Sequence, residues 1–491
     1  MTRHANAPKP LTLGEAVLPI LVMVILFGAG VAAYGVSTEL LIVIMLTSAA
    51  VAGVIAVRRG HTWDQIQRST GDKLAAVLPA ILILLTIGML IGTWVLSGTI
   101  PFLVYWGVQL VSPNYLALTA FLATAVMSLA TGTSWGSAGT IGVALMGTAA
   151  AVGAPMGATA GAVVSGAYFG DKLSPLSDST NIAAIGAGAP LYAHVRHMLY
   201  TAVPSFIMGL LVFGLVARSG TDITSGVPDS ARLLLGDIRN VYSLHWSVLL
   251  PPLIVIASII KRIPPALAMT GASVLAALIG IIVQGFGLHD AITAAVAGFD
   301  TSMLDAASLD PTELSPAFGT LVERGGLYSM ANTLIVVLAA FLLAGTMDAS
   351  GSLDLMINRM LAAVRSVFGL IAATMASGAT MIALTSHGGV TSLVVGELFQ
   401  KAYAERELAP ENLSRSLEDS VTIVEPLMPW TVSAVFMATT LGVPTTTYAP
   451  WAVFCYGGPI FSLLLAATYR RTGFGLRRKQ ADSRTAGQAD S

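Results

Sequence analysis

Residues 131–181 place glycines, hydroxyls and charged side chains within a chain dominated by apolar segments of membrane-spanning length. The end of this stretch reads GDKLSPLSDSTN and includes Asp171, Lys172, Pro175 and Asp178. Because proline lacks an amide hydrogen and clashes with the preceding turn, we expect the helix to break at Pro175. In hydrocarbon, a broken helix persists only inside protein or beside water, and ionisable groups buried there usually mark an ion or substrate path. This pattern predicts a transport site.

The composition places the chain in a bilayer. Of its 491 residues, 55% are hydrophobic and only 10% are charged, whereas soluble domains carry about 25% charged residues. The net charge of −1 excludes the basic field of a nucleic-acid-binding protein. The single cysteine, Cys455, excludes an internal disulfide and any multi-cysteine metal site. We therefore expect an integral membrane protein with lipid as its surroundings, no nucleic-acid partner and no cofactor.

Changes in composition divide the chain into five parts. They are residues 1–72 (an N-terminal arm, two spans and an interfacial helix), 73–217 (a first repeat), 218–329 (a polar linker, a hairpin of two spans and a long polar outer loop), 330–470 (a second repeat) and 471–491 (a basic tail). Arg58 and Arg59, the Lys261–Arg262 turn and the basic tail predict cytoplasmic N- and C-termini in the plasma (inner) membrane. With the termini on this side, the first repeat needs an odd number of crossings. The short segment Pro101–Val111 must then cross the bilayer.

The second half repeats the pattern of the first about 250 residues later. The matching pairs are Ser97-Gly98 with Ser350-Gly351, Thr131–Thr140 with Thr385–Ser392, and Asp171–Asn181 with Glu418–Trp430. An odd number of crossings in each repeat would invert one relative to the other. The sequence therefore predicts an all-α polytopic membrane protein with two inverted repeats, each with a re-entrant hairpin and a broken helix.

The polar residues of these motifs suit a hard cation such as Na⁺, which by analogy with other hard cations prefers oxygen ligands. The candidate cation ligands are Thr133, Ser134, Asp171, Ser177, Asp178, Thr180 and Asn181 in the first half, and Ser386, Asp419, Thr422 and Glu425 in the second. The candidate proton carriers are Asp178 first, then Asp171, Glu425 and His387. A buried carboxylate that binds either a proton or Na⁺, and changes sides only when loaded, would exchange one ion for the other.

Structural roles for the same residues stay open at this point. Asp171-Lys172 fits a solvated helix end with Lys172 reaching the headgroups, and Asp178 fits a helix cap. Glu418-Asp419 fits an exposed first turn, and Glu425 and His387 fit hydrogen-bonded structural residues. His194 and His197, three residues apart on an otherwise ordinary span, do not make a zinc site.

Several motifs resemble a known family. They are GTSWGSAGTIG (132–142), SGAYFGDKLSPLSDSTN (165–181), HVRHMLYTAVPS (194–205), RGGL (324–327), NLSRSLED (412–419) and PLMPW (426–430). Together they are similar to the NhaC family of Na⁺/H⁺ antiporters, in the ion transporter superfamily. The resemblance implies a two-repeat, elevator-type transporter that moves a transport domain against a scaffold. It also implies a signature formed by Asp171, Ser174, Pro175, Ser177, Asp178, Thr180 and Asn181.

The second half departs from that family pattern. Thr385–Gly389 stands where relatives tend to carry an Asp-Gln pair, Glu425 replaces a small polar residue, and Thr431 replaces an asparagine. Similar families include malate–lactate exchangers and amino-acid carriers. We expect a secondary antiporter, not an enzyme, that exchanges Na⁺ or Li⁺ for H⁺; the alternative is coupled transport of a small organic anion or amino acid. The absence of an arginine from both core motifs favours the cation, and a homodimer is left open.

The remaining function classes fit less well. An intramembrane hydrolase would need an ordered nucleophile and base, but Thr133–Gly136 is not a Gly-x-Ser-x-Gly elbow. A channel would not require two matched broken helices, which suit alternating access.

Overall fold

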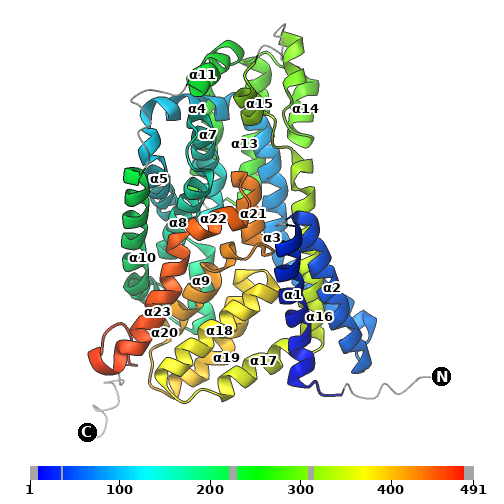
Figure 1. Cartoon of the computed structure of the whole chain (residues 1–491), viewed down its shortest axis with the longest axis vertical. Coiled ribbons are helices and arrows are strands. Elements are labelled where there is room, and N and C mark those ends of the chain that lie inside the picture. Colours follow the sequence, from blue (N-terminus) through cyan, green and yellow to red (C-terminus); the bar gives the residue numbers. More distant parts are fainter. Residues whose placement is uncertain (1–8, 35–36, 220–228, 262, 308–313, 480–491) are drawn as a thin grey trace, which may run out of the picture.

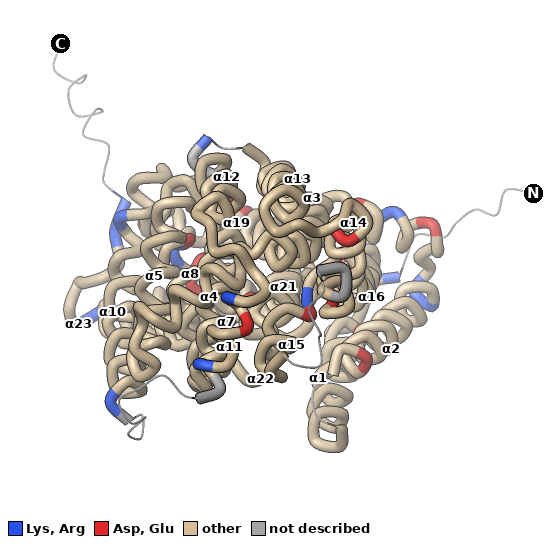
Figure 2. Tube along the Cα trace, turned by 90° about the horizontal axis from the view of Figure 1, so that it is seen from above, with Lys and Arg blue, Asp and Glu red and all other residues tan. Residues whose placement is uncertain are grey.

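The computed structural model describes residues 9–34, 37–219, 229–261, 263–307 and 314–479. Residues 1–8 of the predicted arm and 480–491 of the predicted tail lie outside these ranges. In the described part, nine helices are long and apolar enough to cross a membrane, or up to twelve if each of three bent pairs is one span. The tube in Figure 2 carries few charged residues along these helices. The chain is a multi-pass helical membrane protein, as the composition predicts.

The chain begins with α1 (Leu13–Tyr34), α2 (Thr38–Arg58) and α3 (Trp63–Leu96). The predicted separate interfacial helix at Trp63 is wrong, because α3 is one continuous helix of 34 residues. A capping box between Thr62 and Gln65 fixes its start. The only proline inside it, Pro79, lies at its middle. The division at residues 72–73 therefore falls inside a helix.

The first half continues through seven helices. They are α4 (Thr99–Leu110), α5 (Leu116–Thr131), α6 (Ser134–Ser137), α7 (Val143–Val152), α8 (Met156–Leu173), α9 (Asp178–Ala187) and α10 (Leu191–Ser219). At 1.5 Å per residue, α4 is roughly 18 Å long, too short for a hydrocarbon core of about 30 Å. The central stretch supplies a candidate span of its own, Ser134–Val152, which is long and apolar enough to cross a membrane.

Two polar segments between the halves are helical rather than extended. The predicted linker contains α11 (Asp229–Val241), and the predicted outer loop contains α14 (Leu288–Val296) and α15 (Pro316–Val322). In α11, Ala231, Leu234 and Ile238 recur at helical spacing and are all buried. Between α11 and α14 lie α12 (Leu250–Ile260) and α13 (Pro265–Ile282). Helices α11, α14 and α15 lie at one end of the molecule, opposite the start of α1 and the end of α23 (Val453–Thr472) (Figure 1).

The second half follows the local structure of the first. Its helices are α16 (Ala331–Ala349), α17 (Ser352–Ala362), α18 (Val367–Thr385), α19 (Gly388–Ala404), α20 (Pro410–Leu417), α21 (Val432–Leu441), α22 (Thr445–Tyr448) and α23. Three helix boundaries recur 254 positions apart: the left-handed caps Gly132 and Ser386, the side-chain N-caps Ser177 and Thr431, and the left-handed caps Gly188 and Gly442. The hairpin of α5 and α7 lies towards the upper end in Figure 1, and that of α18 and α19 at the lower end.

The two halves contact each other through α9 and α21, the short helices that follow the two breaks. The rings of Trp135 on α6 and Phe436 on α21 stack with centroids 4.3 Å apart. A Cβ on Gly396 of α19 would lie 2.4 Å from the carbonyl oxygen of Gly186 on α9, so this contact requires glycine. The helix after each break thus packs against the hairpin of the other half, which brings both breaks to the centre of the protein.

Candidate functional site

The first broken helix has the predicted interruption. Helix α8 ends at Leu173 and α9 begins at Asp178. Thr180 Oγ1 donates to the carbonyl oxygens of Asp171 and Lys172, at 3.1 Å each. Asn181 Nδ2 donates to the carbonyl oxygens of Pro175 and Ser177, at 3.0 and 2.7 Å. These two side chains therefore satisfy backbone carbonyl groups that the break leaves without helical partners.

Asp171 is the buried carboxylate of this break. It is 7% exposed, and each of its oxygens accepts a hydrogen bond from a serine. Ser134 Oγ donates to Oδ2 at 2.8 Å, and Ser177 Oγ donates to Oδ1 at 2.6 Å. Ser134 is the first residue of α6 and Ser177 is the N-cap of α9. Thr133 instead caps α6, because its hydroxyl accepts from the Gly136 amide.

Asp178, ranked first among the candidate acids, does not occupy the buried position. It is exposed at the first residue of α9. Ser177 rather than Asp178 caps that helix. A carboxylate in a first helical turn is favourable because it faces the positive end of the helix dipole, so Asp178 needs no bound ion to explain it. Asp171 takes its place as the leading candidate.

The second break carries Glu425. Helix α20 runs into the π-helical turn η7 (Glu418–Thr422), and the chain then bends by 45° before α21. Glu425 is 7% exposed and its carboxylate faces Gly388 at the start of α19 and Ser433 on α21. His387 caps α19 through Nδ1, which accepts from the amide of Val390 at 3.5 Å. That bond favours the structural alternative for His387.

The remaining second-half candidates are also buried. Thr422 is 6% exposed beside Glu418, and Ser386 is fully buried. The Ser386 carbonyl oxygen accepts from the amide of Val432 at 3.2 Å, which joins the hairpin tip to the start of α21. Its hydroxyl has no partner among the residues that the structure describes.

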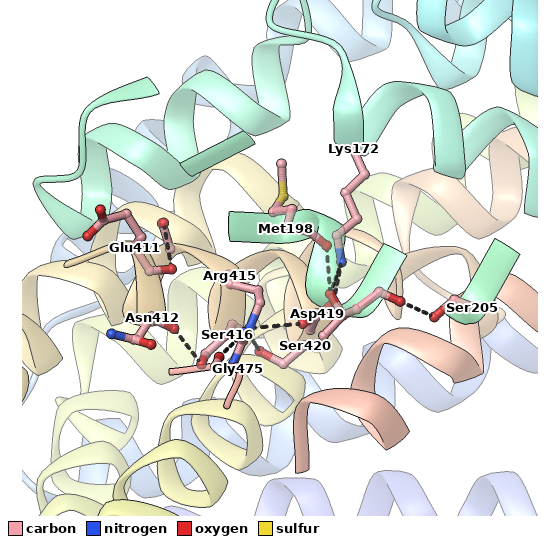
Figure 3. A network of polar contacts seen from close by, with 12 residues as sticks. Lys172, Met198, Ser205, Glu411, Asn412, Arg415, Ser416, Asp419, Ser420 and Gly475 are labelled. Carbon is pink, nitrogen blue, oxygen red and sulfur yellow. Dashed lines mark hydrogen bonds and ion pairs between the residues drawn. The ribbon is translucent and has the colours of Figure 1, made fainter. Parts of the chain in front are cut away.

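A buried ion-pair network joins the two halves beside this site (Figure 3). Lys172 pairs with Asp419, and Thr201 Oγ1 donates to the same carboxylate at 3.2 Å. Arg415 Nε lies 4.0 Å from Asp419 Oδ2, and Arg415 Nη1 donates to the Gly475 carbonyl at 2.6 Å. The side chains of Lys172, Arg415 and Asp419 have no exposed surface.

This network corrects two interpretations of the sequence. Lys172 is not solvated, and Glu418-Asp419 is not an exposed turn. Arg415, which precedes the second core motif, is buried beside them. The charges of Lys172 and Asp419 can be buried because they neutralise each other across the two halves. Asp419 Oδ1 is paired with Lys172, whereas Oδ2 has no hydrogen-bond partner among the described residues.

The geometry around Asp171 suits a desolvated monovalent cation. It offers a carboxylate and two hydroxyl groups, all oxygen donors, at a helix break in the centre of the protein. Among the described residues there is no group of three His, Cys, Asp or Glu side chains that could hold a metal ion. His194 and His197 are buried, and none of their ring nitrogens has a partner in that part of the chain.

Comparison with known proteins identifies the family. Residues 166–468, which include both breaks, match the sequence model of the Na⁺/H⁺ antiporter family. The chain belongs to the Na⁺/H⁺ antiporter family. An uncharacterised Na⁺/H⁺ antiporter of Haemophilus influenzae is 43% identical over 94% of this chain and 96% of its own length.

Two further relatives of this antiporter-family chain match over nearly the full length. The Na⁺/H⁺ antiporter NhaC of Alkalihalophilus pseudofirmus is 34% identical, covering 97% of this chain and 99% of that protein. The arginine/ornithine antiporter ArcD of Halobacterium salinarum is 33% identical, covering 97% and 96% respectively. The relatives of this chain therefore include antiporters that are named for different cargoes.

Proposed function

We propose that the chain is a secondary active antiporter that exchanges Na⁺, or Li⁺, for H⁺ across the plasma membrane. The observation that carries this proposal is the buried Asp171 carboxylate, held by the Ser134 and Ser177 hydroxyls at the break between α8 and α9. A proton or a monovalent cation neutralises this carboxylate, and a low-dielectric site disfavours the unneutralised charge. The two ions therefore compete for one group, which couples their movements.

Alternating access would follow from the two halves acting as inverted repeats. The equal spacing of helix boundaries and the placement of the two hairpins towards opposite ends of the molecule support this arrangement (Figure 1). An elevator-like movement would carry the two breaks together, because the helices after them interlock across the halves. Lipid surrounds the outer helices, and the basic ends of α2 and α23, at Arg58 and at Arg470 and Arg471, support cytoplasmic termini.

The proposal predicts ion exchange by the purified protein in sealed vesicles that contain a pH dye. With an acidic interior, external Na⁺ or Li⁺ should dissipate the proton gradient, because cation entry is coupled to proton exit. Choline chloride at equal concentration controls for ionic strength and should have no effect.

The same vesicles test the alternative cargo class. The lysine of the first break, Lys172, is paired with Asp419, and Arg415 lies 4.0 Å from the same carboxylate, so both nearby basic side chains already face an acid. We therefore expect malate, lactate, arginine and ornithine to leave the gradient unchanged. A response to one of these compounds, together with no response to Na⁺ or Li⁺, would show that the protein carries an organic substrate instead of exchanging cations.

A further inference from the structure

Glu425 is the counterpart of Asp171 in the repeat. The spacing of 254 positions that relates the helix caps of the two halves also relates Asp171 to Glu425, and Ser134 to Gly388. Each acid precedes a short helix after a break, and each faces the first residue of a hairpin helix of its own half. The chain therefore places one buried carboxylate at the same point of both halves.

The two positions differ in a compensating way. On the first side, Asp171 is short and the Ser134 side chain supplies a hydroxyl. On the second side, Gly388 has no side chain, and Glu425 is longer by one methylene. A Cβ built on Gly388 would lie only 2.7 Å from Glu425 Oε2, so the glycine creates the space that the longer acid fills. This fit keeps a carboxylate at the start of the hairpin helix in each half.

Oxygen atoms from both halves converge on Glu425. The Ser433 hydroxyl, 4% exposed, faces the Glu425 carboxylate. Tyr168, on α8 of the other half, approaches the same serine. Its hydroxyl is buried, yet it makes no well-aligned hydrogen bond to any residue that the structure describes. A buried hydroxyl without a partner often indicates an unseen water or ion, and a cation bound at this cluster would give the Tyr168 oxygen a partner.

The surrounding charges indicate a cation at this cluster. Among the ion pairs of the described residues, none involves Glu425, because Lys172 and Arg415 lie against Asp419 instead. Asp171 and Glu425 are both buried, each at the break of its own half. A buried carboxylate is costly unless it is neutralised. A cation at each would remove that cost.

We propose that Glu425, Ser433 and Tyr168 form a second monovalent-cation site, separate from the Asp171 site, so that one chain binds two Na⁺ ions. This inference rests on the proposed function and adds the number of cations to it. The site takes a desolvated alkali cation, with the carboxylate as the charged ligand and the two hydroxyls as neutral ones.

Equilibrium binding of radioactive ²²Na⁺ to the purified full-length protein at alkaline pH tests the proposal. The wild type should bind about two ions per chain and Glu425→Gln about one, because each site depends on one carboxylate. The matched control is Glu397→Gln, which removes the same charge from an exposed position on α19 and should keep both ions. Asp171→Asn should likewise retain one.

Milder variants protect the test against misfolding of Glu425→Gln. Ser433→Ala and Tyr168→Phe each remove one neutral ligand, and each should weaken one of the two binding phases about fivefold, as expected for one lost hydroxyl contact. A wild type that binds one ion, with Glu425→Gln unchanged from it, would overturn the second site and leave the proposed exchange intact. A wild type that binds no Na⁺ would overturn both.

Discussion

Asp171→Asn should abolish Na⁺-driven proton movement while the protein still folds. Asparagine has the same shape and its Oδ1 can still accept a serine hydroxyl, so the break between α8 and α9 should persist. It cannot release a proton at neutral pH or neutralise a bound cation. Removing one partner of a buried charge pair costs about 3–5 kcal/mol, which corresponds to a loss of at least about 100-fold in cation affinity. The exchange rate in vesicles measures this directly.

The control for this prediction is Asp178→Asn. Asp178 is seven residues away and exposed, and its carboxylate forms none of the contacts to Asp171 described above. This variant should keep most of the exchange activity. If Asp178→Asn is inactive and Asp171→Asn exchanges at the wild-type rate, the assignment of the exchanging carboxylate is wrong.

Lys172→Met should strongly destabilise the fold. Methionine fills a similar volume, but it leaves the Asp419 carboxylate inside the protein with only Arg415, at 4.0 Å, as a basic neighbour. Breaking a buried pair by removing one partner costs about 3–5 kcal/mol. Thermal or denaturant unfolding of the purified protein in detergent should show this loss.

Lys401→Met provides the matched control for the same substitution. Lys401 also pairs with a carboxylate, Glu405, but its side chain is 88% exposed and the atoms lie 4.0 Å apart. Surface pairs of this kind contribute about 0–1 kcal/mol. Equal stabilities of the two variants would mean that the Lys172–Asp419 pair does not hold the halves together.

The sequence could predict the break but not which acid it buries. Proline chemistry places the interruption at Pro175 from local rules alone. At a break, however, helical periodicity no longer fixes the direction of the next side chain, so Asp171 and Asp178 are equivalent candidates in the sequence. The choice depends on Ser134, which lies 37 positions earlier and donates to Asp171 only after the hairpin folds.

The ion-pair network was missed for a similar reason. Lys172 and Asp419 are 247 positions apart, and each alone fits a solvated helix end. The available signal was the combination of one lysine at the first break with Arg415, Glu418 and Asp419 shortly before the second. Opposite charges that the two halves carry near their breaks are better interpreted as partners than as separate surface groups.

The short helices α11 and α14 could not be predicted from composition, because their sequences are polar. Residues 229–241 and 288–296 lack a long apolar run, so composition alone predicts a linker and a loop there. Both bury one apolar face against the bundle, as Ala291 and Ala294 do on α14. Amphipathic helices of this length can be recognised from the spacing of their apolar residues, but not from the number of those residues.

The most direct test of the account is the pH dependence of the apparent KM for Na⁺ in vesicles with equal pH on both sides. If a proton and Na⁺ compete for the Asp171 carboxylate, lowering the pH loads the site with protons. The apparent KM should then rise by up to about tenfold per pH unit, while the maximal rate at saturating Na⁺ stays constant. A constant KM with a maximal rate that falls with pH would contradict competition at a shared carboxylate.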